Sequence, residues 1–117
     1  MKRLLACFIL ASMLLPGCAD EKISLINKRN SAIRNRNYQA FLSTWSDACR
    51  QDRETKGLGS NLEWNLLTRN PPILRKVLGV GPNYVTVEET FNGEEVRARY
   101  TFVKERGHWK IDDHSRE

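Results

Sequence analysis

The residue best suited to covalent chemistry in this chain is Cys18, which ends the sequence Leu15-Pro16-Gly17-Cys18. Gly17 has no side chain, so an extended backbone can enter a peptidase cleft directly before the cysteine. The cysteine sulfur can then accept a diacylglycerol group. This combination of residue types predicts lipid attachment at Cys18 after cleavage behind Gly17.

The residues before this motif have the pattern of a secretory signal. A basic pair, Lys2 and Arg3, comes first, and a 12-residue apolar run follows from residue 4 to residue 15. The run is too short for a permanent helix across ~30 Å of hydrocarbon, and it fits the apolar region of a signal peptide. The segment resembles the lipobox signal peptide of bacterial lipoproteins, from which Pro16 departs because small or hydroxylated residues are commoner there. An ordinary secretory signal with an incidental cysteine is the alternative.

The resemblance implies a layout in three parts. Residues 1–17 form the signal peptide, residues 18–22 form the lipidated cysteine with a short polar tether, and residues 23–117 form a single α+β domain. Two or more acyl chains, palmitate among them, hold a protein firmly on a membrane. We therefore expect a lipid anchor in the cell envelope and a domain that faces the periplasm. Ala19 and Asp20 leave the choice between the inner and the outer membrane open.

Charge limits the classes of partner. Loss of residues 1–17 leaves 100 residues, enough for one core, and lowers the formal net charge from +5 to +3 because Lys2 and Arg3 leave with them. A nucleic-acid partner is excluded by the expected compartment. Anionic lipid headgroups are the candidate partner for the basic helical half, and a solvated helix face is the alternative. This half includes Lys28, Arg29, Arg34 and Arg36.

Other reactive side chains give weaker signals. Cys49 is the one free thiol once Cys7 is removed and Cys18 is acylated. A nucleophilic cysteine needs a nearby base, and His108 and His114 follow about 60 residues later. We expect Cys49 to be buried and unreactive and His108 to be exposed beside its glycine turn. No residues have metal-ligand spacing, so we expect neither a metal nor a cofactor.

The first half of the domain has a helical pattern. Apolar residues recur at spacings of three, four or seven from Ile23 to about Trp45. The stretch Arg34-Asn35-Arg36-Asn37 interrupts them, so we predict a helix, a tight bend, and a second helix that opens at Tyr38 with Asn37 as its cap.

Further helical signals follow. The second helix is expected to continue through residues 47–56 to the break at Gly57-Leu58-Gly59. Ser60-Asn61-Leu62-Glu63 matches a capping box and predicts the start of a third helix. That helix must end near Asn70, because Pro71-Pro72 cannot continue it.

Beyond the prolines the apolar period changes to two. The pattern predicts strands at 84–91, 94–104 and 108–113, and one at 73–80 for which a helical turn is the alternative. Asn92-Gly93 is the strongest short hairpin signal, and a two-residue turn there pairs Phe91 with Glu94, Val87 with Ala98, Val85 with Tyr100, Glu88 with Arg97, and Thr86 with Arg99. A turn at Arg106-Gly107 pairs Phe102 with Ile111 in the same way. Both registers give the sheet one apolar face, on which the helices must pack.

This order of elements resembles a small NTF2-like, or SnoaL-like, domain. The resemblance is carried by residues 32–41, where a capping residue precedes a buried aromatic, and by the closing strand Gly107-His108-Trp109-Lys110-Ile111-Asp112-Asp113. It implies the α+β class, with N-terminal helices packed on one face of a curved antiparallel sheet in the shape of a cone.

The resemblance also implies a cavity between the helices and the concave sheet face. The candidate pocket residues are Trp45, Tyr100, Trp109 and Asp113. The predicted register places Tyr100 and Asp113 on the core face, where a carboxylate with a raised pKa could act as a general base and the tyrosine could bind a substrate oxygen. The alternative is that Asp113 is solvated near the chain end and that the tryptophans fill the core.

We therefore expect a non-enzymatic, lipid-anchored module that binds another envelope protein. Its contact surface is either the polar face of the sheet or the basic helical half, and the polar face carries Thr86, Glu88, Arg97 and Arg99. The alternatives are a binder of a small apolar ligand of unknown identity, with an NTF2-like cavity, and an enzyme that relies on Asp113 and Tyr100.

Overall fold

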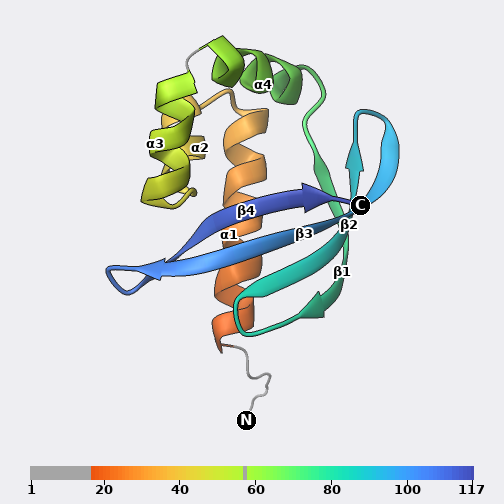
Figure 1. Cartoon of the computed structure of the whole chain (residues 1–117). Coiled ribbons are helices and arrows are strands. Elements are labelled where there is room, and N and C mark those ends of the chain that lie inside the picture. The colour runs from red at the N-terminus through yellow and green to blue at the C-terminus, as the bar shows by residue number, and fades with distance from the viewer. Residues whose placement is uncertain (1–16, 57) are drawn as a thin grey trace.

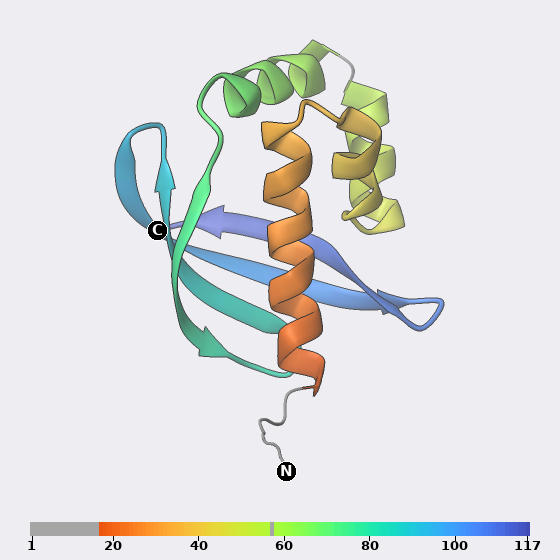
Figure 2. The same cartoon turned by 180° about the vertical axis from the view of Figure 1, so that it is seen from behind.

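The computed structural model describes residues 17–56 and 58–117, which form four helices followed by four strands (Figures 1 and 2). The predicted signal-peptide residues 1–16 lie outside the described residues. No helix in the described ranges is both long and apolar enough to span a membrane. The α+β class predicted from the sequence, with helices against one face of an antiparallel sheet, is confirmed.

The predicted helix, bend and helix are present as α1 (Gly17–Arg34) and α2 (Tyr38–Ser43). The side chain of Asn37 accepts a hydrogen bond from the amide of Ala40 at 3.1 Å, so it caps α2 as predicted. Helix α1 begins at Gly17, so the residues predicted to form a short tether, 18–22, are part of this helix. Lys22 is 2% exposed, and its Nζ donates to the carbonyl of Pro82 at 3.1 Å, which ties the start of α1 to the loop at residues 81–83.

Two helix boundaries differ from the prediction. Residues 47–56 form a separate helix, α3 (Asp47–Lys56), because the chain leaves α2 to pair with the sheet. There the amide of Ser46 donates to the carbonyl of Ile111, and the amide of Ile111 donates to the carbonyl of Thr44, both at 2.8 Å. Helix α4 (Leu58–Arg69) begins two residues before Ser60, so the predicted capping box lies inside its first turns. It ends before Pro71-Pro72, as predicted.

The sheet has the strand order β1-β2-β3-β4, and all neighbours are antiparallel. Its strands are β1 (Ile73–Val80), β2 (Tyr84–Phe91), β3 (Glu94–Glu105) and β4 (His108–Arg116). The five pairs predicted between β2 and β3 all occur. Asn92 and Gly93 have φ of 54° and 84°, the conformation that a two-residue turn requires.

A bulge in β4 changes the register that the sequence predicts. Phe102 pairs with Ile111 as expected, but the next partner along β4 is Asp113, which pairs with Thr101, so Asp112 is an extra residue. One extra residue moves the following side chains to the other face of a strand. The prediction that Asp113 shares the core face with Tyr100 is therefore wrong, since Tyr100 pairs with His114 and Asp113 is exposed.

The core lies between α1, α2 and one face of the sheet (Figure 2). Its members are apolar side chains from both layers, including Ile26, Ile33, Phe41, Trp45, Val85, Val87, Tyr100, Phe102 and Ile111. The edge of β4 is covered where Trp45 bridges to Ile111. The opposite face of the sheet carries no helix in the described part of the chain (Figure 1).

Candidate functional site

A charged cluster occupies the space in which the sequence predicted a cavity. The guanidinium of Arg29, from α1, lies 5.9 Å from the ring centroid of Trp45 and 5.6 Å from that of Tyr100. Arg29 is 2% exposed, and Trp45 and Tyr100 are 3% and 0% exposed. Its side chain therefore fills the region between the two predicted pocket residues.

Glu89 is the centre of this cluster. Its carboxylate is fully buried and accepts hydrogen bonds from Tyr100 Oη at 2.8 Å and from Arg116 Nε at 3.1 Å. Arg29 Nη1 in turn lies 3.3 Å from Tyr100 Oη. The imidazole of His114 stacks on the ring of Tyr100, with 4.2 Å between centroids, and its Nε2 is 3.5 Å from Glu89. Three strands thus meet at a single carboxylate, and α1 is linked to it through Tyr100.

The cluster sets the charge state of its own members. Burial raises the pKa of Glu89, but the opposing effects of His114, Tyr100 and Arg116 are larger together and hold it at about 2. Burial, together with the charges of Arg29 and Arg116, lowers the pKa of His114 to about 4, although Glu89 acts in the opposite direction. Burial also raises the pKa of Tyr100. At neutral pH, Glu89 is therefore an anion, His114 is neutral and Tyr100 keeps its proton.

The sequence contains a signal for this cluster that the prediction did not use. Glu89 continues the alternation of Val85 and Val87 on the core face of β2, and Arg29 lies at helical spacing between Ile26 and Ile33. A charged residue inside an apolar stripe is informative, because it must be paired when it is buried. Arg29 therefore does not belong to the exposed basic surface expected around Lys28, Arg34 and Arg36, which are exposed.

The four predicted pocket residues do not converge. Tyr100 and Trp45 are buried around Arg29, and Asp113 is exposed on the far side of the bulge. Trp109 is half-buried and lines a cleft of about 550 Å³ between α1 and the start of β4. The walls of this cleft consist of Glu21, Ser24, Leu25 and Lys28 of α1, Ser43 of α2, and residues 107–110.

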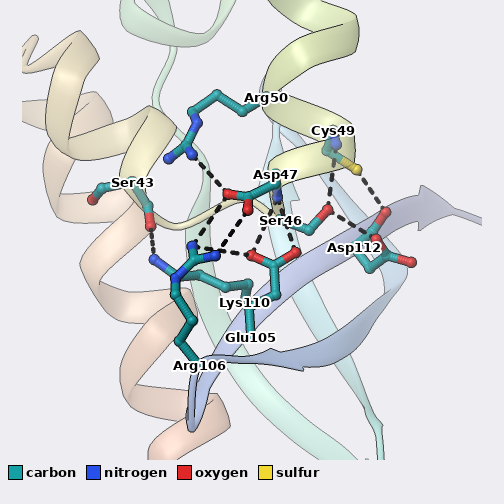
Figure 3. A network of polar contacts seen from close by, with 9 residues as sticks. All are labelled: Ser43, Ser46, Asp47, Cys49, Arg50, Glu105, Arg106, Lys110 and Asp112. Atoms are coloured by element: carbon teal, nitrogen blue, oxygen red, sulfur yellow. Dashed lines mark hydrogen bonds and ion pairs between the residues drawn. The ribbon is translucent and has the colours of Figure 1, made fainter.

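A second polar network fastens the helices to the β3–β4 hairpin (Figure 3). Asp47, at the start of α3, accepts from Arg106 at 3.1 Å and from Arg50 at 2.7 Å, while its amide donates to Glu105 at 3.0 Å. The hydrogen bond from Arg106 lowers the pKa of Asp47. Lys110 Nζ donates to the carbonyl of Ser43 at 2.7 Å. These contacts hold the hairpin against α2 and α3, beside the cleft.

Cys49 belongs to this network and is partly buried rather than buried. Its thiol donates to the carbonyl of Asp112 at 2.8 Å, and its amide donates to Ser46 Oγ at 3.3 Å. Ser46 Oγ also donates to the carboxylate of Asp112 at 2.8 Å, so both interactions fix the bulge. His108 is exposed, as expected. Within the described ranges no group of three metal-ligating side chains comes together.

The predicted interaction residues lie on the sheet face that the helices leave open. Arg97 and Arg99 are exposed, and Thr86 and Glu88 are half-buried beside them, in the predicted cross-strand pairs. The guanidinium of Arg99 packs 4.6 Å from the ring centroid of Tyr84. This face is therefore an ordered surface of mixed charge.

Removing the central carboxylate should destabilise the whole domain. We expect Glu89→Ala to lower the free energy of unfolding by about 3–5 kcal/mol, because it breaks the buried ion pair with Arg116 and leaves the buried hydroxyl of Tyr100 without its acceptor. Glu88→Ala removes the same side chain from the next residue, on the opposite face, and should cost about 0.5 kcal/mol or less. Urea denaturation at pH 7 compares the two, and equal losses would contradict the role assigned to Glu89.

His114 should make stability depend on pH. The pKa of His114 in the folded protein, about 4, is below its ordinary value of 6.5. Between these two pH values the unfolded chain binds a proton at this residue and the folded chain does not. The free energy of unfolding therefore falls as the pH falls from about 6.5 to 4. The expected loss between pH 7 and pH 5 is about 2 kcal/mol. His114→Phe keeps a ring against Tyr100 and should remove most of this loss, whereas His108→Phe should retain it. Urea titrations at several pH values measure the slope.

Comparisons with known proteins give similarity to solved structures and not to families or curated proteins. No family model matches the sequence, and no curated protein matches it. Among solved structures, the chain is similar to an NTF2-like protein of unknown function from Cytophaga hutchinsonii. The two are 14% identical, the match covers 81% of this chain and 88% of that one, and the TM-score is 0.44. The fold class of this chain accordingly rests on its own elements and strand order.

Proposed function

We propose that this protein is a lipid-anchored accessory module of the cell envelope, held at the membrane through Cys18 and facing the periplasm, that binds another envelope protein. One observation carries the binding mode: the cluster around Glu89 lies in the interior, whereas the open face of the sheet presents exposed charged side chains. A polar surface of mixed charge fits a protein partner of complementary charge. The anchor is proposed from the sequence motif.

We also propose that the domain is NTF2-like, with the interior closed. Helices that precede an antiparallel meander and pack on one of its faces support this assignment. The enzymatic alternative relied on Tyr100 and Asp113, and these residues lie on different faces of the sheet. We therefore propose a function without catalysis.

A second candidate function is the binding of a small ligand. The observation in its favour is the cleft beside Trp109, whose volume of about 550 Å³ is within the usual range of ligand sites. Its walls combine apolar side chains, such as Leu25 and Trp109, with a few polar groups. This proposed ligand site lies beside α1 and not in the cavity predicted from the sequence.

Acylation has a direct test. Cells that express the wild-type chain and are fed radiolabelled palmitate should yield a labelled product in the membrane fraction. Cys18→Ser should abolish the label, because the serine hydroxyl cannot replace the sulfur in this modification. Cys49→Ser is the matched control and should keep both label and fractionation. A labelled Cys18→Ser product, or an unlabelled wild-type product, would refute the anchor.

The sheet face can be tested by site-specific photocrosslinking in intact cells. A photoreactive amino acid in place of Arg97 or Arg99 should give a discrete crosslinked band containing an envelope protein. Arg69, an exposed arginine at the end of α4, is the matched control position and should give none. Crosslinks from Arg69 alone, or from none of the three positions, would contradict a partner on this face.

A further inference from the structure

We propose that the cleft between α1 and the start of β4 binds the phosphate group of an anionic membrane lipid beside the anchor. The inference deepens the proposed function, since it rests on attachment through Cys18. It assigns a ligand class to a site that the sequence did not predict.

The walls of the cleft favour an anion. Lys28 of α1 and Lys110 of β4 line the cleft together with one carboxylate, that of Glu21. The charge of Lys110 also acts on Asp47 behind the wall. Lys110 uses one of the three donors of its ammonium group for Ser43, so it is held in position with donors to spare. An ammonium held in this way stabilises a phosphate oxygen through a charge-assisted hydrogen bond.

Two further ammonium groups lie near the ring of Trp109, a residue of the same wall. The ammonium of Lys22 lies 4.7 Å from its ring centroid, and that of Lys104 lies 5.2 Å away. Both distances are within the range of cation–π contacts. The cleft wall itself holds two lysines, Lys28 and Lys110, and one acidic residue, Glu21. The ring of Trp109 is of the type that prefers the headgroup level of a bilayer.

The position of the cleft argues for a lipid rather than a soluble anion. Glu21, the first wall residue, follows Cys18 by three residues of α1, a rise of about 4.5 Å in an α-helix. Leu25 and Lys28 follow at helical spacing, so the wall runs along α1 from the end that carries the anchor. Acyl chains inserted through Cys18 would hold this end at the headgroup level, where each nearby basic residue adds about 1 kcal/mol of attraction to anionic lipid.

Lysine labelling provides the test. The acylated full-length protein is reconstituted in phosphatidylcholine nanodiscs with or without phosphatidylglycerol, treated briefly with acetic anhydride and analysed by mass spectrometry. Phosphatidylglycerol should reduce the acetylation of Lys28 and Lys110 at least threefold. Lys76, which is exposed on β1, is the internal control and should change little. Equal labelling in both discs, or equal protection of Lys76, would overturn the proposal.

Two variants distinguish the cleft from a general charge effect. Ser24→Glu adds a carboxylate to the cleft wall and should abolish the protection of Lys110. Asn27→Glu adds the same charge at an exposed position of α1 outside the wall and should retain it. The same loss in both variants would contradict binding in the cleft.

The source of the phosphate is tested separately. Glycerol 3-phosphate added to phosphatidylcholine discs should give no protection at the concentration at which the lipid protects. Protection of Lys28 and Lys110 by glycerol 3-phosphate would show that the cleft binds a soluble phosphate ester and would overturn the proposal of a lipid ligand. A failure of the anchor itself appears as missing palmitate label at Cys18, so the two failures are distinguishable.

Discussion

The pairing of Glu89 with its buried partners is the constraint on which the interior depends. A buried carboxylate is tolerated only when charges and hydrogen bonds satisfy it, and here its direct partners come from β3 and β4. Arg29 of α1 joins the cluster through the hydroxyl of Tyr100. The same arrangement brings the guanidinium of Arg29 between Trp45 and Tyr100. Polarity in this core therefore fixes how the helix layer meets the sheet, and the side chain of Arg29 fills the region between Trp45 and Tyr100.

The parts of the fold that could be predicted are those governed by local rules. Asn92-Gly93 imposes a tight turn, and a two-residue turn leaves one register for the strands beside it, so each predicted pair of β2 and β3 was correct. Asn37 and the proline pair mark helix ends by mechanisms that involve only neighbouring residues. The α+β class follows from the change of period between the two halves of the chain.

The site could not be predicted because one bulge decides it. Asp112 is held out of register by contacts with Ser46 and Cys49, residues more than 60 positions earlier in the chain. These are tertiary contacts between α3 or the residue before it and β4, so they cannot be predicted from the local sequence pattern of β4. Because of the bulge, Asp113 and His114 lie on the faces opposite to those predicted. The residue paired with Tyr100 is therefore His114 rather than the predicted Asp113.

The two proposed contact surfaces lie on different sides of the sheet. The cleft lies on the side of α1, whereas Arg97 and Arg99 project from the face that α1 does not cover. The network around Asp47 holds the β3–β4 hairpin to α2 and α3 and so keeps the cleft wall in place (Figure 3). If the end of α1 that carries Cys18 rests on a bilayer, the cleft contacts the headgroups while the open sheet face stays available to a partner, so both proposed contacts can form at once.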